Sequence, residues 1–203
     1  MNVFWALGYE GTSLTDLTQA MNVNRPSLYA AFGSKKRLFA EALALYEEIE
    51  GGVITRMLDD AAAARAGIEA TLRHNARVYV EEGRPRGCMI VLSLLVGTPE
   101  SSQTRSLLVE RRLAGEAELR RRIERGKTEG DVPPDANSAR LAAFYTAVLQ
   151  GMSIKARDGA AETELDEIVS LAMSVWPENE AVSVPVAGQS RRVTRKPVLK
   201  KKA

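Results

Sequence analysis

This sequence of 203 residues has few of the residues that metal, redox and catalytic sites require. A single cysteine, Cys88, excludes a disulfide bond within the chain, and a single histidine, His74, leaves too few soft ligands for an ordinary zinc site. A di-iron centre in a helical bundle would need paired Glu-x-x-His motifs. The sequence contains no glycine-rich phosphate loop, and LRHNARV around His74 offers no neighbouring nucleophile. We therefore expect no metal, no cofactor and no enzymatic activity.

Long apolar runs are also missing. The longest, CMIVLSLLVG at residues 88–97, is far shorter than the roughly 20 residues that span a bilayer. Met1 is not followed by a basic segment with an apolar run, the pattern of a secretory signal. We expect a cytoplasmic protein without membrane contact, with one sizeable core or a small domain beside a larger one.

The net charge of +2 conceals an uneven distribution. From Ala181 onward the chain has seven basic residues and no acidic one, which leaves 21 basic against 26 acidic residues upstream, a net charge of −5. The tail lacks helical periodicity and bulky aromatic residues, so we expect residues 179–203 to be disordered. Two interpretations remain open: the tail contacts DNA phosphates, or it is only a solvated extension.

Residues 13–45 predict three helices separated by tight turns. In the first, SLTDLTQAM, Ser13 and Asp16 have the spacing of a capping box, and Asn22 suits the left-handed conformation that closes a helix. Asn24 is expected to cap a second short helix, with Leu28 and Phe32 buried. Gly33 ends that helix, and Ser34 begins a third with apolar positions at Leu38, Ala42 and Leu45.

Two short helices joined by a tight turn are typical of a helix-turn-helix, whose second helix can enter the major groove of DNA. With Leu28 buried, the second helix exposes Arg25, Pro26, Ser27 and Tyr29. Arginine can pair with guanine, serine can bond a base or a phosphate, and the proline ring can meet a thymine methyl group. Lys35 adds a positive charge at the next helix N-terminus. Packing of Tyr29 and a solvated face at Lys35 are the structural alternatives.

The segment from Gly8 to Leu43, GYEGTSLTDLTQAMNVNRPSLYAAFGSKKRLFAEAL, closely resembles the DNA-binding domain of the TetR/AcrR family of bacterial transcriptional regulators. The resemblance implies an all-α fold in which residues 24–32 form the recognition helix. It further implies base contacts by Arg25, Pro26 and Ser27, and contacts with the DNA backbone by Thr12, Tyr29 and Lys35. Asn22 stands where the family usually has glycine.

A second departure from the family lies before the motif. Family members have a further helix there, preceded by a short basic arm, whereas here only MNVFWALGYEG precedes Thr12. Phe4, Trp5 and Leu7 are typical of the last turns of that helix, so we expect a truncated first helix. Either the true start lies upstream of Met1, or the DNA-binding domain is weakened. In the second case the chain would be a ligand-binding or partner-binding helical protein that has lost DNA binding.

The rest of the chain predicts five or six further helices. CMIVLSLLVG is apolar on nearly every face and predicts a buried central helix. The following segment, residues 104–130, predicts a long charged helix whose pairs Glu116/Arg120 and Glu118/Arg122 lie on a solvated face.

The last two predicted helices each have two apolar faces. Residues 136–156 repeat a small residue every four positions, at Ala139, Ala143, Ala147 and Gly151, while Phe144, Val148 and Met152 face elsewhere. In residues 164–176 one face has Leu165, Ile168, Ala172 and Val175, and another has Val169, Met173 and Trp176. One face of each helix suits the core, and the other suits a second copy of the chain, unless one chain covers both.

The resemblance supplies the remaining expectations. It implies a helix-turn-helix domain at residues 1–50 and a larger helical ligand-binding and dimerisation domain at residues 51–178, with the dimer formed through residues 138–176. The partners would be double-stranded operator DNA with an inverted repeat and an unknown small-molecule ligand that releases a repressor. The ligand-binding residues are unknown; His74, Tyr79, Cys88 and Phe144 are candidates only because they offer polar or aromatic groups among aliphatic neighbours, and core packing is the alternative for each.

Overall fold

The structure, a computed structural model, describes residues 1–177, and in this range it contains helices and no strands. The expected all-α class is confirmed. The predicted basic tail lies outside the described residues. The elements in chain order are α1 (Asn2–Gly11), α2 (Leu14–Met21), α3 (Arg25–Phe32), α4 (Lys35–Tyr46), the π-helix η1 (Glu47–Gly51), α5 (Gly52–Asp60), α6 (Ala64–Val78), α7 (Met89–Leu92), the 3-10 helix η2 (Pro99–Ser101), α8 (Ser102–Glu129), α9 (Ser138–Arg157) and α10 (Glu162–Met173).

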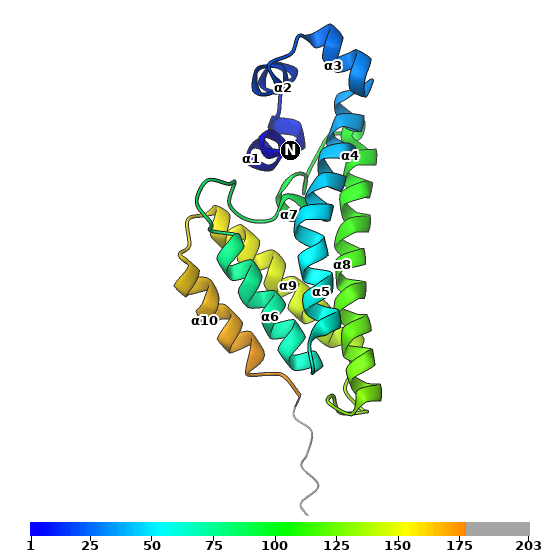
Figure 1. Ribbon diagram of the computed structural model, residues 1–203, viewed down its shortest axis with the longest axis vertical. Coiled ribbons are helices and arrows are strands. Elements are labelled where there is room, and N and C mark those ends of the chain that lie inside the picture. Colours follow the sequence, from blue (N-terminus) through cyan, green and yellow to red (C-terminus); the bar gives the residue numbers. More distant parts are fainter. Residues whose placement is uncertain (178–203) are drawn as a thin grey trace, which may run out of the picture.

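The molecule is elongated, with α1, α2 and α3 at one end (Figure 1). Helix α4 continues through η1 into α5 along the long axis, and α8 lies beside this line (Figure 1). Helices α6, α9 and α10 form the other side of the larger region, and α8 packs on α9 (Figure 1). None of the helices within residues 1–177 is long and apolar enough to cross a bilayer.

The caps expected from the sequence around α2 and α3 are confirmed. Ser13 and Asp16 form a capping box, with Asp16 N–H donating to Ser13 Oγ at 3.1 Å and Ser13 N–H to Asp16 Oδ2 at 2.7 Å. Asn22 is left-handed at φ 52° and ψ 45°, and it is the only non-glycine residue with positive φ in the described part of the chain. Asn24 accepts from Ser27 N–H at 2.8 Å, and Gly33 ends α3 at φ 72°. Local chemistry therefore sets the relative placement of the two motif helices.

The described residues form two apolar cores. The core of the N-terminal end contains Phe4, Trp5, Leu17, Leu28 and Phe39, and it extends to Met89, Leu94 and Leu108 from α7, α8 and their connection. Leu38 belongs to the same core as Phe4, Trp5 and Leu17. Leu7 and Leu45 are exposed, so the prediction that Leu45 belongs to the buried stripe of α4 is wrong. The second core lies among α5, α6, α8, α9 and α10.

The chain passes from the first region to the second without a break in the helix. Residues 47–51 form a π-helix turn, and Gly51 and Gly52 both have right-handed helical φ and ψ. The predicted division at residues 50 and 51 therefore falls inside one continuous helical rod, α4–η1–α5.

The apolar segment of residues 88–97 differs from the prediction. Only Met89–Leu92 form a helix, and Leu95 and Val96 are exposed, so the prediction of a buried central helix is wrong. The Ser93 carbonyl accepts a hydrogen bond from Tyr9 N–H at 2.7 Å. This carbonyl therefore accepts from α1 and not from a further turn of α7, so residues 93–97 contact the N-terminal helices.

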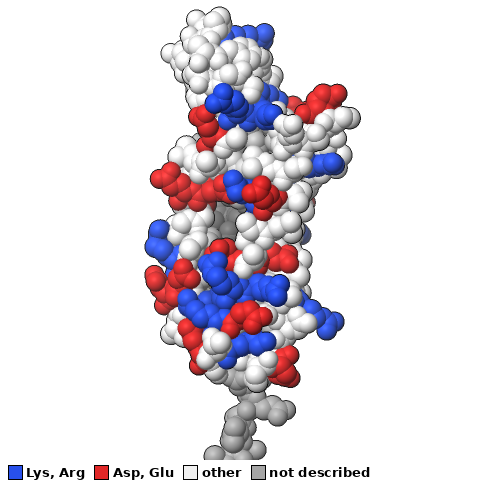
Figure 2. Space-filling view, turned by 90° about the vertical axis from the view of Figure 1, so that its right-hand side faces the viewer, with Lys and Arg blue, Asp and Glu red and all other residues white. Residues whose placement is uncertain are grey.

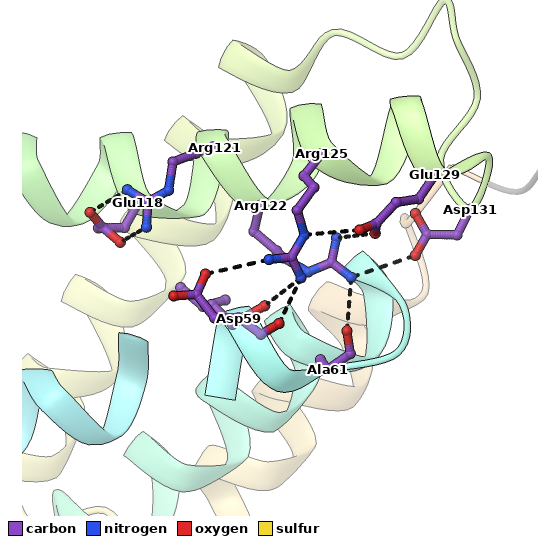
Figure 3. A network of polar contacts seen from close by, with 9 residues as sticks. Asp59, Ala61, Glu118, Arg121, Arg122, Arg125, Glu129 and Asp131 are labelled. Atoms are coloured by element: carbon purple, nitrogen blue, oxygen red, sulfur yellow. Dashed lines mark hydrogen bonds and ion pairs between the residues drawn. The ribbon is translucent and has the colours of Figure 1, made fainter. Parts of the chain in front are cut away.

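The long helix α8 is confirmed, but neither of its predicted ion pairs, Glu116/Arg120 and Glu118/Arg122, is present among the described residues. Glu118 pairs with Arg121, whereas Arg122 is buried and pairs with Glu129 at 3.2 Å and Asp131 at 3.8 Å (Figure 3). Arg122 also donates to the Ala61 carbonyl at 3.1 Å. This network ties the lower end of α8 to the start of α6, so Arg122 has a structural role and does not lie on a solvated face.

Candidate DNA-binding surface and ligand cavity

Helix α3 presents four of the predicted DNA-contacting side chains to solvent. Arg25, Pro26, Ser27 and Tyr29 are exposed, while Leu28 is 1% exposed and anchors the helix in the N-terminal core. Asn24 caps the helix, so these side chains lie on its first two turns. This end of a helix carries unpaired N–H groups and favours anions. The arrangement suits a helix that enters a groove with its N-terminal half.

Arg25 is oriented by a residue that the sequence reasoning missed. Its Nη2 donates to Thr15 Oγ1 of α2 at 3.0 Å, and both residues are exposed. Position 15 follows the capping residue by two, and its hydroxyl faces the same solvent as α3. The polar character of Thr15 on an otherwise amphipathic helix is the only sequence signal that pointed to this contact.

Lys35 and Thr12 lie differently from the four exposed side chains. The Nζ atom of Lys35 lies 4.6 Å from the centre of the Tyr9 ring, and partial burial lowers the pKa of Lys35 despite the nearby carboxylates of Glu10 and Asp16. Thr12 is 1% exposed, and its hydroxyl donates to the Gly8 carbonyl at 2.6 Å. Thr12 is thus the buried C-cap residue of α1, whereas Lys35 is half-buried at the start of α4.

Helices α9 and α10 expose an apolar face at the far side of the larger region. The small residues at positions 139, 143, 147 and 151 are all exposed, as are Phe144, Ile154, Leu171 and Val175. Leu171 and Val175 are 74% and 59% exposed. In α10 and the turn after it the predicted division into two faces is wrong in detail, because Leu165, Val169, Ala172, Met173 and Trp176 share the buried side.

A cavity of about 430 Å³ lies in the larger region, next to the N-terminal domain. Its wall comes from α1, the α4–η1–α5 rod, α6, α7 with the segment before it, α8 and α9. On the side of α8 the molecular surface is hollowed between an upper and a lower group of charged side chains (Figure 2). Three of the four candidate residues, His74, Tyr79 and Cys88, line the cavity. Phe144 does not, because it belongs to the exposed face of α9.

Four polar side chains of the wall, those of Tyr46, His74, Tyr79 and Cys88, are neutral at physiological pH because burial disfavours the charged form of each. Burial raises the pKa of Cys88 and of Tyr79 and Tyr46, so the thiol and both phenols keep their protons. Tyr46 donates to Cys88 Sγ at 3.4 Å. Burial, followed by the charge of Arg77, lowers the pKa of His74, so the imidazole is uncharged at neutral pH. The wall can therefore offer hydrogen bonds without adding charge at these positions.

Two hydroxyl groups in the wall have no partner. Thr71 Oγ1 on α6 and Thr146 Oγ1 on α9 are buried and make no hydrogen bond with any residue in the described range. Thr71 is 1% exposed. Buried polar groups without partners are uncommon in folded proteins. These hydroxyls are consistent with a cavity that receives a ligand with polar atoms.

Trp5 links the cavity to the N-terminal helices. Its ring lines the cavity, its Nε1–H donates to the Gly87 carbonyl at 2.9 Å in a buried hydrogen bond, and the guanidinium of Arg84 lies 4.6 Å from the ring centre. The same helix, α1, bends at Gly8, which has φ 73°. A Cβ there would lie 2.9 Å from the Ser93 carbonyl oxygen, so only glycine fits.

Arg157 of α9 holds the same helix from another direction. Its Nη1 and Nη2 donate to the carbonyls of Ala6 at 3.0 Å and Trp5 at 2.8 Å, just before the bend. Helix α1 is therefore attached to the segment before α7 through Trp5, to the segment after α7 through Tyr9 and to α9 through Arg157. None of these contacts was evident from the sequence, because the paired residues are 82 to 152 positions apart and a main-chain carbonyl is the acceptor in each pair.

The known proteins to which this chain is similar are bacterial transcriptional regulators. The sequence model of "Bacterial regulatory proteins, tetR family" matches residues 1–42. The TetR family transcriptional regulator CifR, in a cysteine-substituted form complexed with 26-base-pair double-strand operator DNA, is 43% identical, covers 87% of this chain and 92% of its own, and superposes with a TM-score of 0.86. Among curated proteins, the HTH-type transcriptional repressors ComR and BdcR of Escherichia coli (strain K12) are each 29% identical to this chain. The match with ComR covers 88% of this chain and 85% of ComR, and that with BdcR covers 84% and 81%.

Proposed function

We propose that this chain, which belongs to the TetR family of bacterial regulatory proteins and is a DNA-binding transcriptional regulator, represses transcription as a homodimer that a small molecule releases from its operator. The relatives ComR and BdcR are named as repressors, and the CifR structure contains operator DNA. Repression, dimerisation and release are the parts of this proposal that go beyond the family assignment.

The DNA-reading element in this proposal is the first half of α3. Arg25 reads a guanine, and Pro26 and Ser27 approach neighbouring bases. Tyr29 and Lys35 hold the sugar-phosphate backbone, and Thr12 supports the site from within by ending α1. The support for this assignment is that α3 exposes Arg25, Pro26, Ser27 and Tyr29 together, while Leu28 holds the helix in the core.

The dimer in this proposal forms through the exposed apolar face of α9 and α10. A surface that combines small residues with Leu171, Val175 and Phe144 can approach a copy of itself closely, as helix ridges pack into grooves. A two-fold axis there makes both faces equivalent. Two copies of α3 would then meet successive major grooves about 34 to 36 Å apart, so the operator would be an inverted repeat.

Release in this proposal starts at Trp5. The one observation that carries it is that the wall of the cavity includes a side chain of the first helix of the DNA-binding domain. A ligand that presses on Trp5 or on Arg84 shifts α1, and with it the core that holds α3. The effect on DNA affinity cannot exceed the difference between the ligand's affinities for the two conformations.

In vitro selection from random double-stranded DNA with the full chain tests the proposal. We expect enriched sequences to contain an inverted repeat, and the complex to contain two chains per DNA by light scattering. Enrichment of a single unrepeated site by a monomer would contradict the dimeric arrangement. An absence of any enriched sequence would contradict the assignment of α3 as a sequence reader.

A further inference from the structure

The charged residues in the wall of the cavity are paired, with one exception. Glu47 pairs with Arg111 at 3.0 Å, Glu50 pairs with Arg84 at 2.6 Å, and Glu118 pairs with Arg121. The remaining charged wall residue is Arg112 of α8, which pairs with no carboxylate among residues 1–177. The wall therefore has one positive charge whose counterion the described chain does not supply.

The surroundings of Arg112 leave most of its guanidinium available to a ligand. Its Nη1 donates to the Ile90 carbonyl at 3.0 Å, and its other N–H groups have no partner among the described residues. The side chain is half-buried, and burial lowers its pKa. Arginine nevertheless stays protonated in proteins, so the charge persists in a partly desolvated position.

We infer that the cavity binds a small amphipathic organic acid whose carboxylate pairs with Arg112 and whose apolar part lies against Trp5 and the aliphatic wall. The inference rests on the proposed function, because it takes this cavity as the ligand site. The aliphatic wall includes Ile54, Val78 and Leu149. A planar guanidinium with free N–H groups matches the two oxygens of a carboxylate.

The rest of the wall favours a monoanion over a phosphate or a dianion. Within residues 1–177 only one guanidinium of the wall, that of Arg112, lacks a carboxylate partner, and the carboxylates of Glu47, Glu50 and Glu118 also line the cavity. A second negative charge on the ligand would face these carboxylates without a cation of its own. The unpartnered hydroxyl of Thr71 offers a further hydrogen bond to the ligand's polar end or to a substituent.

The probes that we choose are ω-phenylalkanoates with two to eight carbons in the chain, each compared with its primary amide. Acid and amide have nearly the same shape, so the comparison isolates the negative charge. The readout is the emission of Trp5 in the full chain with Trp176→Phe, which leaves Trp5 as the only tryptophan of this sequence. Because Trp5 lines the cavity, its emission reports binding there.

We expect the tightest acid to bind about tenfold or more strongly than its amide. Arg112→Gln should reduce this preference to about threefold or less. Arg112→Lys, which keeps the charge without the planar fork, should retain part of the preference. Arg120→Gln is the matched control, because Arg120 is exposed on the same helix and does not line the cavity, and it should leave the preference unchanged.

Three outcomes would overturn the inference: amides that bind as tightly as acids, no acid binding at about 1 mM, or a folded Arg112→Gln variant that keeps the full preference. Operator binding is measured separately by fluorescence anisotropy with the same ligands. Acids that bind in the cavity but leave operator affinity unchanged would contradict ligand release and leave the ligand class intact. Amides that bind as tightly as the acids and release the operator would support ligand release and contradict the ligand class.

Discussion

Replacing Trp5 with Phe removes one buried hydrogen bond while keeping an aromatic ring in the core. The lost donor leaves the Gly87 carbonyl without its indole partner, which costs about 1 to 3 kcal/mol. The weaker attraction between the phenyl ring and Arg84 adds up to about 0.5 to 1 kcal/mol. We expect a loss of about 1 to 4 kcal/mol, which for a chain of this size lowers the melting temperature by roughly 2 to 16 °C.

Trp176→Phe is the matched control for this measurement. Trp176 is also buried, but its indole N–H makes no hydrogen bond with the described residues. Circular dichroism during urea and thermal unfolding compares the two variants under the same conditions. Equal losses for Trp5→Phe and Trp176→Phe would refute the reasoning, because the whole effect would then come from the change of ring size. A larger loss for Trp5→Phe, with weaker ligand release, would support the attachment of α1 through Trp5.

Further predictions concern DNA reading, assembly and a helix cap. Arg25→Ala should weaken binding to the selected operator by about 1 to 3 kcal/mol and relax the base preference at one position per half-site. Lys35→Ala should weaken binding to every DNA sequence alike and reduce the salt dependence by about one phosphate contact. Identical behaviour of both variants on matched and scrambled DNA would contradict the division between base contacts and backbone contacts. Ala147→Glu places a charge on the exposed face of α9 and should give monomers in light scattering; an unchanged dimer would move the interface elsewhere. Hydrogen bonds from Ser13 lower the pKa of Asp16, so the stabilisation by the capping box is present above the ordinary pKa of aspartate and is lost as the pH falls through the lower folded value. The difference in stability between the wild type and Asp16→Ala should therefore shrink in acid, and a constant difference would argue against the capping role.

The motif helices could be predicted from the sequence because their signals are local. Ser13, Asn24 and Ser34 each bond a backbone N–H three residues ahead, and Asn22 and Gly33 take positive φ at the following turns. Such contacts depend on residue type and spacing, and both are visible in the sequence. The exposure of Ser27 and Tyr29 followed from the burial of Leu28, because adjacent positions of a helix point in different directions, and Arg25 lies at the N-terminal end of the helix.

The features that could not be predicted depend on contacts between segments that are far apart in the sequence. Residues 88–97 are apolar enough for a buried helix, yet the Ser93 carbonyl bonds Tyr9 and the helix stops at Leu92. Arg122 looked like a surface partner of Glu118, but the connection between α5 and α6 brings Ala61 to it and the turn after α8 brings Asp131. Spacing along one helix gives no information about a second segment that packs on it. For the same reason the cavity, with Trp5 and Arg112 in its wall, could not be assigned from the sequence.

Operator binding should depend on the distance between the two half-sites of the selected inverted repeat. The full chain is titrated by fluorescence anisotropy against the natural spacing and against operators with about 5 or about 10 added base pairs, half a turn and one turn of DNA. We expect half a turn to reduce affinity to that of a single half-site, because two copies of α3 related by a two-fold axis can no longer face both grooves. Affinity that is independent of the spacing would contradict the dimeric regulator described here.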